Sequence, residues 1–281
     1  MTHIARLQRM NHGSHFRAFT LRGGQPVTAI DPFLAVDHAW TSGPTFPPHP
    51  HAGFSAVSYL FLDSETGIDN RDSLGNRNLI QPGGLHWTAA GSGVVHEEVP
   101  VETGKTVHML QIFINLPQPL QGAAPFALSL EARDVPVAQW PGVKVRVPLG
   151  SFADVRSPLS PPTEVLLLDI SLEPGAQLTV PIAAGHGAFV MPIDGELAVD
   201  GQPFDLMQAR LPVSPPQPEA RQLSLRADQG PAKAVLFSGR PLGQPVYWQG
   251  PLALASQEAL AAAVEAYQRG AFGTLQTRRS P

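Results

Sequence analysis

The chain has 281 residues and a net charge of −4, with 43% hydrophobic and only 15% charged residues. This composition excludes a disordered chain, and the lack of a long basic run argues against nucleic acid as a direct partner. The sequence contains no cysteine. Disulfides and thiolate chemistry are therefore excluded, and any metal must be held by histidine and carboxylate side chains.

Proline and glycine punctuate the whole chain. The sequence has 30 proline and 26 glycine residues, well above their combined average share of about 12%. This predicts many short strands joined by turns. No stretch approaches the ~18 consecutive apolar residues of a membrane span, and the first residues lack the apolar run of a signal peptide. We therefore expect a cytoplasmic protein that makes no contact with membranes.

Two series of strands are expected in chain order. The first comprises residues 15–21, 31–37, 53–62, 69–71, 78–81, 85–89 and 107–116. A proline-rich connector, 117–163, carries short strands such as 144–147, and the second series comprises 164–172, 177–181, 188–192, 196–199, 222–225 and 233–237. The similar spacing of the two series indicates an internal duplication, with domains at 1–135 and 136–281.

A single helix is expected near the end of the chain. Ser256 has the properties of an N-cap, and Gly270 those of a residue that ends a helix. Between them, Leu260, Val264 and Tyr267 fall on one helical face. This pattern predicts a short helix that packs against one end of the fold.

Two pairs of metal-ligating residue types lie 45 residues apart. His49 and His51 flank Pro50, and His96 and Glu98 repeat the spacing of two. On a strand, residues two apart point to the same side of the sheet, and proline between them suits an edge strand. If two such strands lie side by side, three imidazoles and one carboxylate converge, and we predict that they bind one divalent metal ion. Such a ligand set suits Fe(II), Mn, Co, Ni, Cu or Zn.

A His-x-His pair alone is a weak signal. With 10 histidines in 281 residues, about 0.36 such pairs are expected by chance. Exposed loop histidines are therefore the alternative interpretation of His49 and His51. The second His-x-carboxylate pair, the turns between the two pairs and the many-stranded context favour the metal site.

Several longer motifs resemble those of the pirin family, within the cupin superfamily. They extend over nearly the whole chain: Gly43-x5-His49-x-His51, Pro48-His49-Pro50-His51-x-Gly53-Phe54, Asp72-Ser73-Leu74-Gly75-Asn76, Thr88-Ala89-Ala90-Gly91-x-Gly93-x-Val95-His96-x-Glu98, Gln111-x3-Asn115-Leu116-Pro117, Ser238-Gly239-x-Pro241-Leu242-Gly243-Gln244-Pro245-Val246 and Ala266-Tyr267-Gln268-x-Gly270-x-Phe272-Gly273.

The resemblance implies an all-β bicupin, made of two β-barrels and a short C-terminal helix. It implies one metal, usually iron, in the N-terminal barrel, with His49, His51, His96 and Glu98 as ligands. Many cupins place a glutamate where this chain has Ser55 and Ala56, so Glu98 supplies the carboxylate, as in pirins. Many pirins also have an arginine directly after the second histidine of the pair, where this chain has Ala52. The C-terminal barrel is expected to lack a metal site.

The resemblance also implies an activity, although the sequence leaves open whether the chain is an enzyme. The first hypothesis is an iron-dependent dioxygenase that opens flavonol-type aromatic substrates such as quercetin with O₂. Glu98 is then a metal ligand and the candidate catalytic base, with a metal-bound water as the alternative base. The alternative is a metal-binding, redox-sensing regulator without turnover that acts by binding another protein.

Other residues near these motifs have simpler explanations. Glu97 alternates with Glu98 and is expected to be a solvated carboxylate. His86 is expected to be a core or rim histidine rather than a fifth ligand, and His108 a structural histidine or a hydrogen-bond partner of a ligand. His186 has no second histidine two positions away, so no comparable site is expected around it. Apolar side chains are expected either in the core or around a pocket above the metal: Phe46, Phe54, Trp87, Met109 and Phe113.

Overall fold

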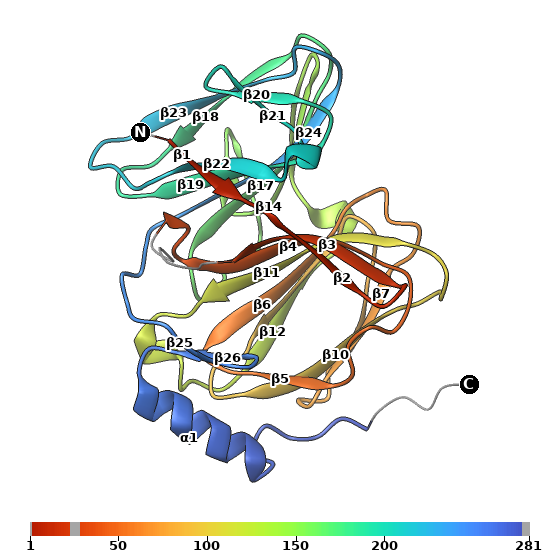
Figure 1. Ribbon diagram of the computed structural model, residues 1–281, viewed down its shortest axis with the longest axis vertical. Helices are drawn as coiled ribbons and strands as arrows, with labels where there is room; N and C mark the ends of the chain where they lie inside the picture. The colour runs from red at the N-terminus through yellow and green to blue at the C-terminus, as the bar shows by residue number, and fades with distance from the viewer. Residues whose placement is uncertain (1, 23–28, 277–281) are drawn as a thin grey trace. The chain divides into compact units, whose positions relative to one another are not determined.

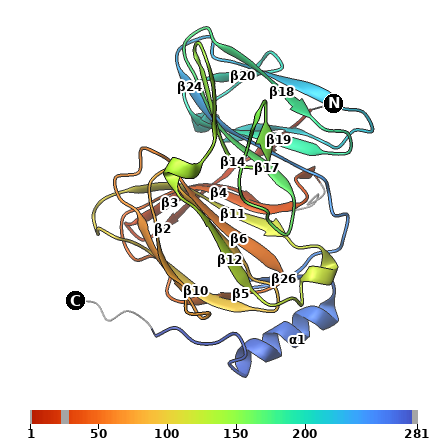
Figure 2. The same ribbon diagram turned by 180° about the vertical axis from the view of Figure 1, so that it is seen from behind.

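The computed structural model describes residues 2–22 and 29–276 and divides into two compact units. The unit that holds the three predicted histidine ligands, here the histidine unit, comprises Met10–Ala18, Val36–Arg133 and Gly243–Pro281. The other, here the companion unit, comprises Met1–Arg9, Phe19–Ala35 and Asp134–Leu242. Figures 1 and 2 show the chain from two sides, coloured along the sequence.

The histidine unit is built on two sheets. A seven-stranded sheet has the order β12-β9-β6-β11-β4-β3-β2, and a four-stranded sheet has the order β5-β10-β7-β8. The bounds are β2 (Gln8–His12), β3 (Phe16–Arg22), β4 (Phe33–Thr41), β5 (His49–His51), β6 (Phe54–Leu60), β7 (Ile68–Asp72), β8 (Arg77–Ile80), β9 (Leu85–Ala89), β10 (Val94–Pro100), β11 (Val107–Asn115) and β12 (Phe126–Leu130).

The apolar core of this unit lies between its two sheets. Leu60 and Met109 contribute from β6 and β11, while Ile68 and Ile80 contribute from β7 and β8. Strand β6 is buried along its whole length, including its two serines, Ser55 and Ser58, because a strand covered on both faces has no exposed position. The buried core holds the four-stranded sheet, which carries the histidines, in place.

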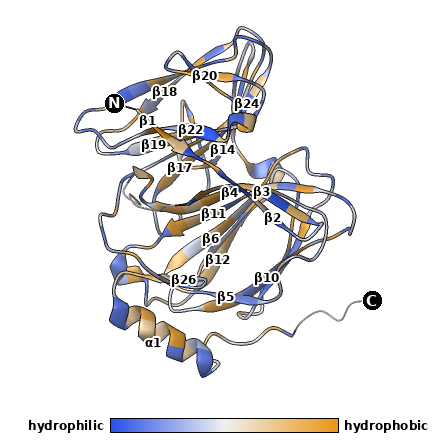
Figure 3. Ribbon diagram, in the orientation of Figure 1, coloured by the Kyte–Doolittle hydropathy of each residue, from blue (hydrophilic) through white to orange (hydrophobic). Residues whose placement is uncertain are grey.

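The last part of the chain packs against the strands that carry the histidines. It forms the hairpin β25 (Tyr247–Gln249) and β26 (Leu252–Leu254), followed by α1 (Gln257–Gln268). Figures 1 and 2 show this segment in blue beside β5, and Figure 3 shows hydrophobic and hydrophilic residues mixed along α1. The contact is apolar, and the buried residues are Ala52, Val95, Leu252, Leu254, Leu260, Ala263 and Phe272.

The companion unit repeats the two-sheet plan. Its sheets have the orders β1-β22-β19-β24-β17-β14-β13 and β18-β23-β20-β21. In β18, buried and exposed residues alternate, so Leu178, Val180 and Ile182 face the core between the sheets. The bounds are β1 (His3–Arg6), β13 (Val137–Trp140), β14 (Val143–Leu149), β17 (Val165–Leu172), β18 (Gln177–Ile182), β19 (Gly187–Asp194), β20 (Leu197–Val199), β21 (Gln202–Phe204), β22 (Arg210–Ser214), β23 (Arg221–Arg226) and β24 (Ala232–Gly239), with a small hairpin β15 (Ser151–Phe152) and β16 (Val155–Arg156) and the short 3-10 helix η4 (Leu206–Gln208). The short 3-10 helix η2 (Gln118–Leu120) belongs to the histidine unit, and η3 (Ala132–Asp134) lies where the chain passes from the histidine unit to the companion unit.

The all-β architecture and most of the expected strands are confirmed, many within one or two residues of their predicted ends. The expected helix is α1, with Ser256 as its N-cap. On its buried face, Ala263 takes the place that the sequence assigned to Tyr267, which is exposed. Within the described residues no helix is long and apolar enough to cross a membrane.

The units differ from the expected division after residue 135. The C-terminal segment from Gly243 belongs to the histidine unit, and two N-terminal segments belong to the companion unit. The physical reason is packing: Leu252, Leu254 and Leu260 bury their side chains against Ala52 and Val95, whereas β1 pairs with β22. The division into domains at residues 1–135 and 136–281 stays a prediction.

Candidate metal centre

Two neighbouring strands carry the histidines. Strand β5 pairs antiparallel with β10, and His96 lies directly opposite His49. Strand β5 is the edge of its sheet, which suits Pro50, because proline has no N–H to offer to a further strand. The period of two then directs His49 and His51 to the same side as His96.

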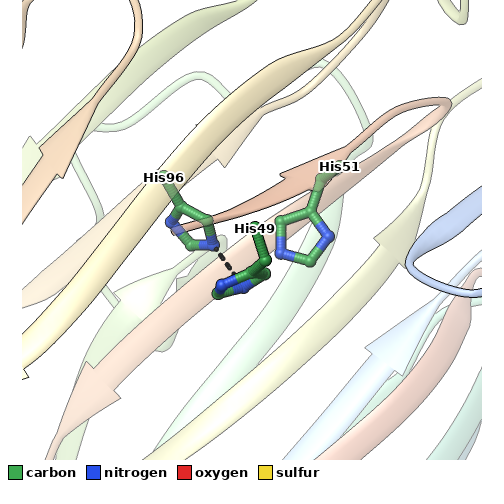
Figure 4. Close-up of side chains that lie close together, drawn as sticks. All are labelled: His49, His51 and His96. Carbon is green, nitrogen blue, oxygen red and sulfur yellow. Dashed lines mark hydrogen bonds between the residues drawn. The ribbon is translucent and has the colours of Figure 1, made fainter. Parts of the chain in front are cut away.

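The three imidazoles converge as predicted. One ring nitrogen from each lies within 4.8 Å of the others, and the Nε2 atoms of His49 and His96 are 3.1 Å apart. Figure 4 shows the three rings turned toward one another, with the contact between His96 and His49 as a dashed line. His51 and His96 are buried, and His49 is half-buried. Within the described part of the chain, this is the only group of three or more potential ligands close enough to bind one ion.

Hydrogen bonds hold two of the rings in a suitable tautomer. The Nδ1 of His49 lies 2.9 Å from the carbonyl oxygen of Pro47, and the Nδ1 of His51 lies 3.3 Å from that of Pro251. A carbonyl oxygen can only accept, so both Nδ1 atoms carry hydrogen, and in the neutral rings both Nε2 atoms keep a free lone pair. Metal-binding histidines use this arrangement.

Burial keeps the imidazoles in the form that binds a metal. Burial, together with the neighbouring His49, lowers the pKa of His51 to about 3, and burial followed by the other two histidines lowers that of His96 well below its usual value. The rings are therefore neutral at pH 7, as metal ligation requires. The buried Nδ1 of His96 has no hydrogen-bond partner. A group of three neutral nitrogen donors fits a divalent transition metal ion.

Glu98 lies beside this group but is not part of it. It shares a strand face with His96, and both of its carboxylate oxygens are 2.8 Å from the Oγ of Ser58, which can donate one hydrogen bond. The same hydroxyl is 3.1 Å from the Oε1 of Gln111. Burial raises the pKa of Glu98 to about 7, and the bond from Ser58 opposes this rise. The structure thus brings three of the four predicted ligands together, and ligation by Glu98 stays a prediction.

Glu97 corrects one expectation. It points away from Glu98 along the strand, but it is buried rather than solvated. Its Oε2 accepts hydrogen bonds from Arg71, from Nε at 2.9 Å and from a terminal nitrogen at 2.7 Å. Arg71 lies opposite Glu97 on β7, so this ion pair ties the ligand strand β10 to its other neighbour.

The other histidines of this unit lie outside the candidate centre. His86 is a core histidine, as expected, and its Nδ1 and Nε2 lie near Ser129 and Asn70. His108 contacts Asp63 and His38, with 2.6 Å between the two Nε2 atoms. Sequence reasoning missed this pair, and no alternation along β4 identifies His38, because that strand is buried at all positions but one.

Aromatic side chains surround the imidazoles. The ring centroids of Phe54 and Phe113 lie 5.1 and 5.6 Å from that of His51, and Phe46, partly exposed, lies 6.4 Å from His49. These three expected neighbours are therefore at the site. Trp87 and Met109 lie in the core instead.

Comparisons with known proteins agree with this geometry. The pirin family model matches residues 11–114, and the model of the pirin C-terminal cupin domain matches residues 167–273. A Pseudomonas aeruginosa protein named "Putative quercetin 2,3-dioxygenase" is 32% identical over 270 residues, which make up 92% of each chain. A pirin-like protein of Caulobacter vibrioides is 30% identical over 279 residues, 96% of this chain and 97% of the relative.

Solved structures show the same fold. A crystal structure of quercetin 2,3-dioxygenase from Acinetobacter baumannii has a TM-score of 0.86 at 24% identity and covers 98% of both chains. The bacterial pirin YhhW from Escherichia coli, solved in complex with nickel(II), has a TM-score of 0.66 at 18% identity, over 86% of this chain and all of the other. The fold is that of a bicupin with a candidate metal centre in one unit. The chain belongs to the pirin family.

Proposed function

We propose that this protein is a metal-dependent dioxygenase that opens flavonol-type aromatic substrates such as quercetin, with Fe(II) as the cofactor. One observation carries the proposal: three imidazoles, two of them buried and one half-buried, converge at the strand that also carries the carboxyl group of Glu98. The relative from Pseudomonas aeruginosa, whose name refers to a quercetin 2,3-dioxygenase, supports the choice of substrate. We propose His49, His51, His96 and Glu98 as the metal ligands.

The bound ion would lower the pKa of a substrate hydroxyl and polarise the groups that it binds. The rest of the chemistry falls to the chain itself. In the metal-free protein burial raises the pKa of Glu98 to about 7, and a bound ion would lower it again. Glu98 would then be ionised at neutral pH and able to accept the proton of the flavonol hydroxyl. Before the proton is transferred, Ser58 holds the carboxylate of Glu98 in place by donating a hydrogen bond to it.

The aromatic side chains suit a flat substrate. Phe54 and Phe113 pack against each other with ring centroids 5.1 Å apart, and both contact His51. Phe46 lies on the side of His49. Phenyl rings attract a flat aromatic ligand through edge-to-face or offset stacking. We propose that Phe46 and Phe113, which are at least partly exposed, orient the flavonol ring next to the metal, and that the fully buried Phe54 supports Phe113.

The test measures oxygen consumption of Fe(II)-loaded protein with quercetin. We expect uptake of O₂ together with loss of the flavonol absorption band, and no uptake by His96→Ala. The matched control is Glu97→Gln, because Glu97 neighbours a proposed ligand but faces Arg71. If the wild-type protein binds iron and consumes no O₂ with quercetin or related flavonols, the enzymatic proposal is wrong. That result would leave the alternative of a metal-binding regulator.

A further inference from the structure

One of the three imidazoles depends on a segment far away in the sequence. The Nδ1 of His49 donates to Pro47, in the loop just before its own strand. The Nδ1 of His51 donates instead to the carbonyl oxygen of Pro251, 200 residues along the chain. Pro251 lies in the tight turn between β25 and β26, so the hairpin Tyr247–Leu254 determines which nitrogen of His51 carries the hydrogen.

The hairpin backbone lies directly on the end of β5. Leu252 forms a parallel bridge with Ala52, and the amide of Ala253 donates to the carbonyl of Ala52 at 3.1 Å. Gly53 has a φ of +84°, and a Cβ at this position would collide with the carbonyl oxygen of Ala253. Only glycine therefore lets the hairpin approach so closely, immediately after the two ligands of β5.

The hairpin also makes apolar contacts with β10, the second strand that carries a histidine of the candidate centre. Leu252 and Leu254 pack in the same buried cluster as Val95, the neighbour of His96 on β10. The ring of Trp248 lies 5.7 Å from that of Phe54, and Phe54 in turn contacts His51. The hairpin thus reaches both strands that carry the three histidines.

We propose that the hairpin Tyr247–Leu254 is a clasp that positions His51 for metal binding, so that closure of the clasp and metal affinity are coupled. A carbonyl acceptor on Nδ1 fixes both the tautomer and the orientation of an imidazole, and such partners are worth roughly 10- to 100-fold in metal affinity. Coupling of this kind is reciprocal, so the metal also stabilises the closed clasp. The inference rests on the proposed metal centre and is independent of any reaction with O₂.

The first test needs no variant. Hydrogen exchange of the wild-type protein is measured with and without Co(II), and the readout is the rate in peptides that cover residues 247–255. We expect slower exchange in these peptides when Co(II) is bound, and unchanged exchange in β18 of the companion unit. Binding of Co(II) with unchanged exchange of the clasp would overturn this inference alone. Absence of Co(II) binding would overturn both the clasp and the proposed metal centre.

The second test displaces the clasp by substitution. Gly53→Ala places a methyl group against the carbonyl of Ala253, and the matched control is Gly104→Ala. Gly104 has a φ of +91° but open space around it, so both variants introduce the same kind of backbone strain and only one touches the clasp. We expect the Kd for Co(II) to rise roughly 10- to 100-fold in Gly53→Ala only, together with a changed visible spectrum of the bound Co(II). Equal Kd values and spectra for the two variants would overturn the inference.

Discussion

Glu98 should make the metal-free protein less stable above pH 7, and removing its charge should make it more stable. The pKa of Glu98 rises from 4.5 to about 7 on folding, chiefly through burial. The folded state therefore holds this proton more tightly than the unfolded state. This tighter proton binding contributes fully to the free energy of unfolding below about pH 4.5, and the contribution is lost as the pH rises from about 4.5 through about 7. With about 1.4 kcal/mol for each pKa unit, the full cost of the charged form is at most about 3.5 kcal/mol.

Glu98→Gln keeps the shape and an acceptor for Ser58 but cannot ionise. In urea titrations of the metal-free protein with a chelator present, we expect the variant to gain about 2 kcal/mol in free energy of unfolding relative to wild type between about pH 5 and about pH 8. A bound divalent ion should reverse the order, because it compensates the charge in the wild-type protein alone.

The control for this measurement is the neighbouring carboxylate. Glu97→Gln leaves Arg71 without its charged partner, so it should destabilise the protein by about 3 kcal/mol instead of stabilising it. If Glu98→Gln shows the same difference from wild type at both pH values, Glu98 is charged at little cost. The assignment of a proton-accepting role to it would then lose its physical basis.

Three further results are expected. His96→Ala should lose bound metal while its circular dichroism stays native, because apolar cores hold both units; unfolding on chelation alone would indicate a structural metal. Burial lowers the pKa of His86 from 6.5 to about 4, so as the pH falls the unfolded chain is protonated at this residue before the folded chain is. Up to about 3.5 kcal/mol of stability is therefore lost as the pH falls from 6.5 to 4, and urea titrations across this range should show a smaller loss for His86→Gln. Ser256→Ala removes the acceptor for the amide of Ala259 and should lower the stability of α1 by about 1 kcal/mol. Faster hydrogen exchange in α1 is the expected result, and unchanged exchange would contradict a capping role.

The sequence predicts the parts of the site that depend on local periodicity. His49 and His51 point the same way because they are two apart on a strand, and His96 follows the same rule on the adjacent strand. Strands such as residues 85–89 could be located because turns with glycine and proline bound them. Ser256 could be identified as an N-cap because capping involves only residues close in sequence.

Features that depend on distant partners could not be predicted in this way. The burial of Glu97 depends on Arg71, which only the pairing of β10 with β7 places opposite it. The contact of Pro251 with His51 joins residues 200 positions apart. No periodic pattern in either segment indicates that the two would meet, so the role of the C-terminal hairpin emerges only from the fold.

The direction of the pKa shifts explains why a cation should bind here. Burial lowers the pKa of His51 and His96 and raises that of Glu98, so each group is displaced toward its neutral form. No positively charged side chain forms a hydrogen bond or salt bridge with the carboxylate of Glu98 among the contacts described for it, and Arg71 binds Glu97 instead. A divalent ion would supply that missing positive charge and use the free lone pairs of the imidazoles at the same time. A bound ion would therefore offset the cost that burial imposes on an ionised Glu98.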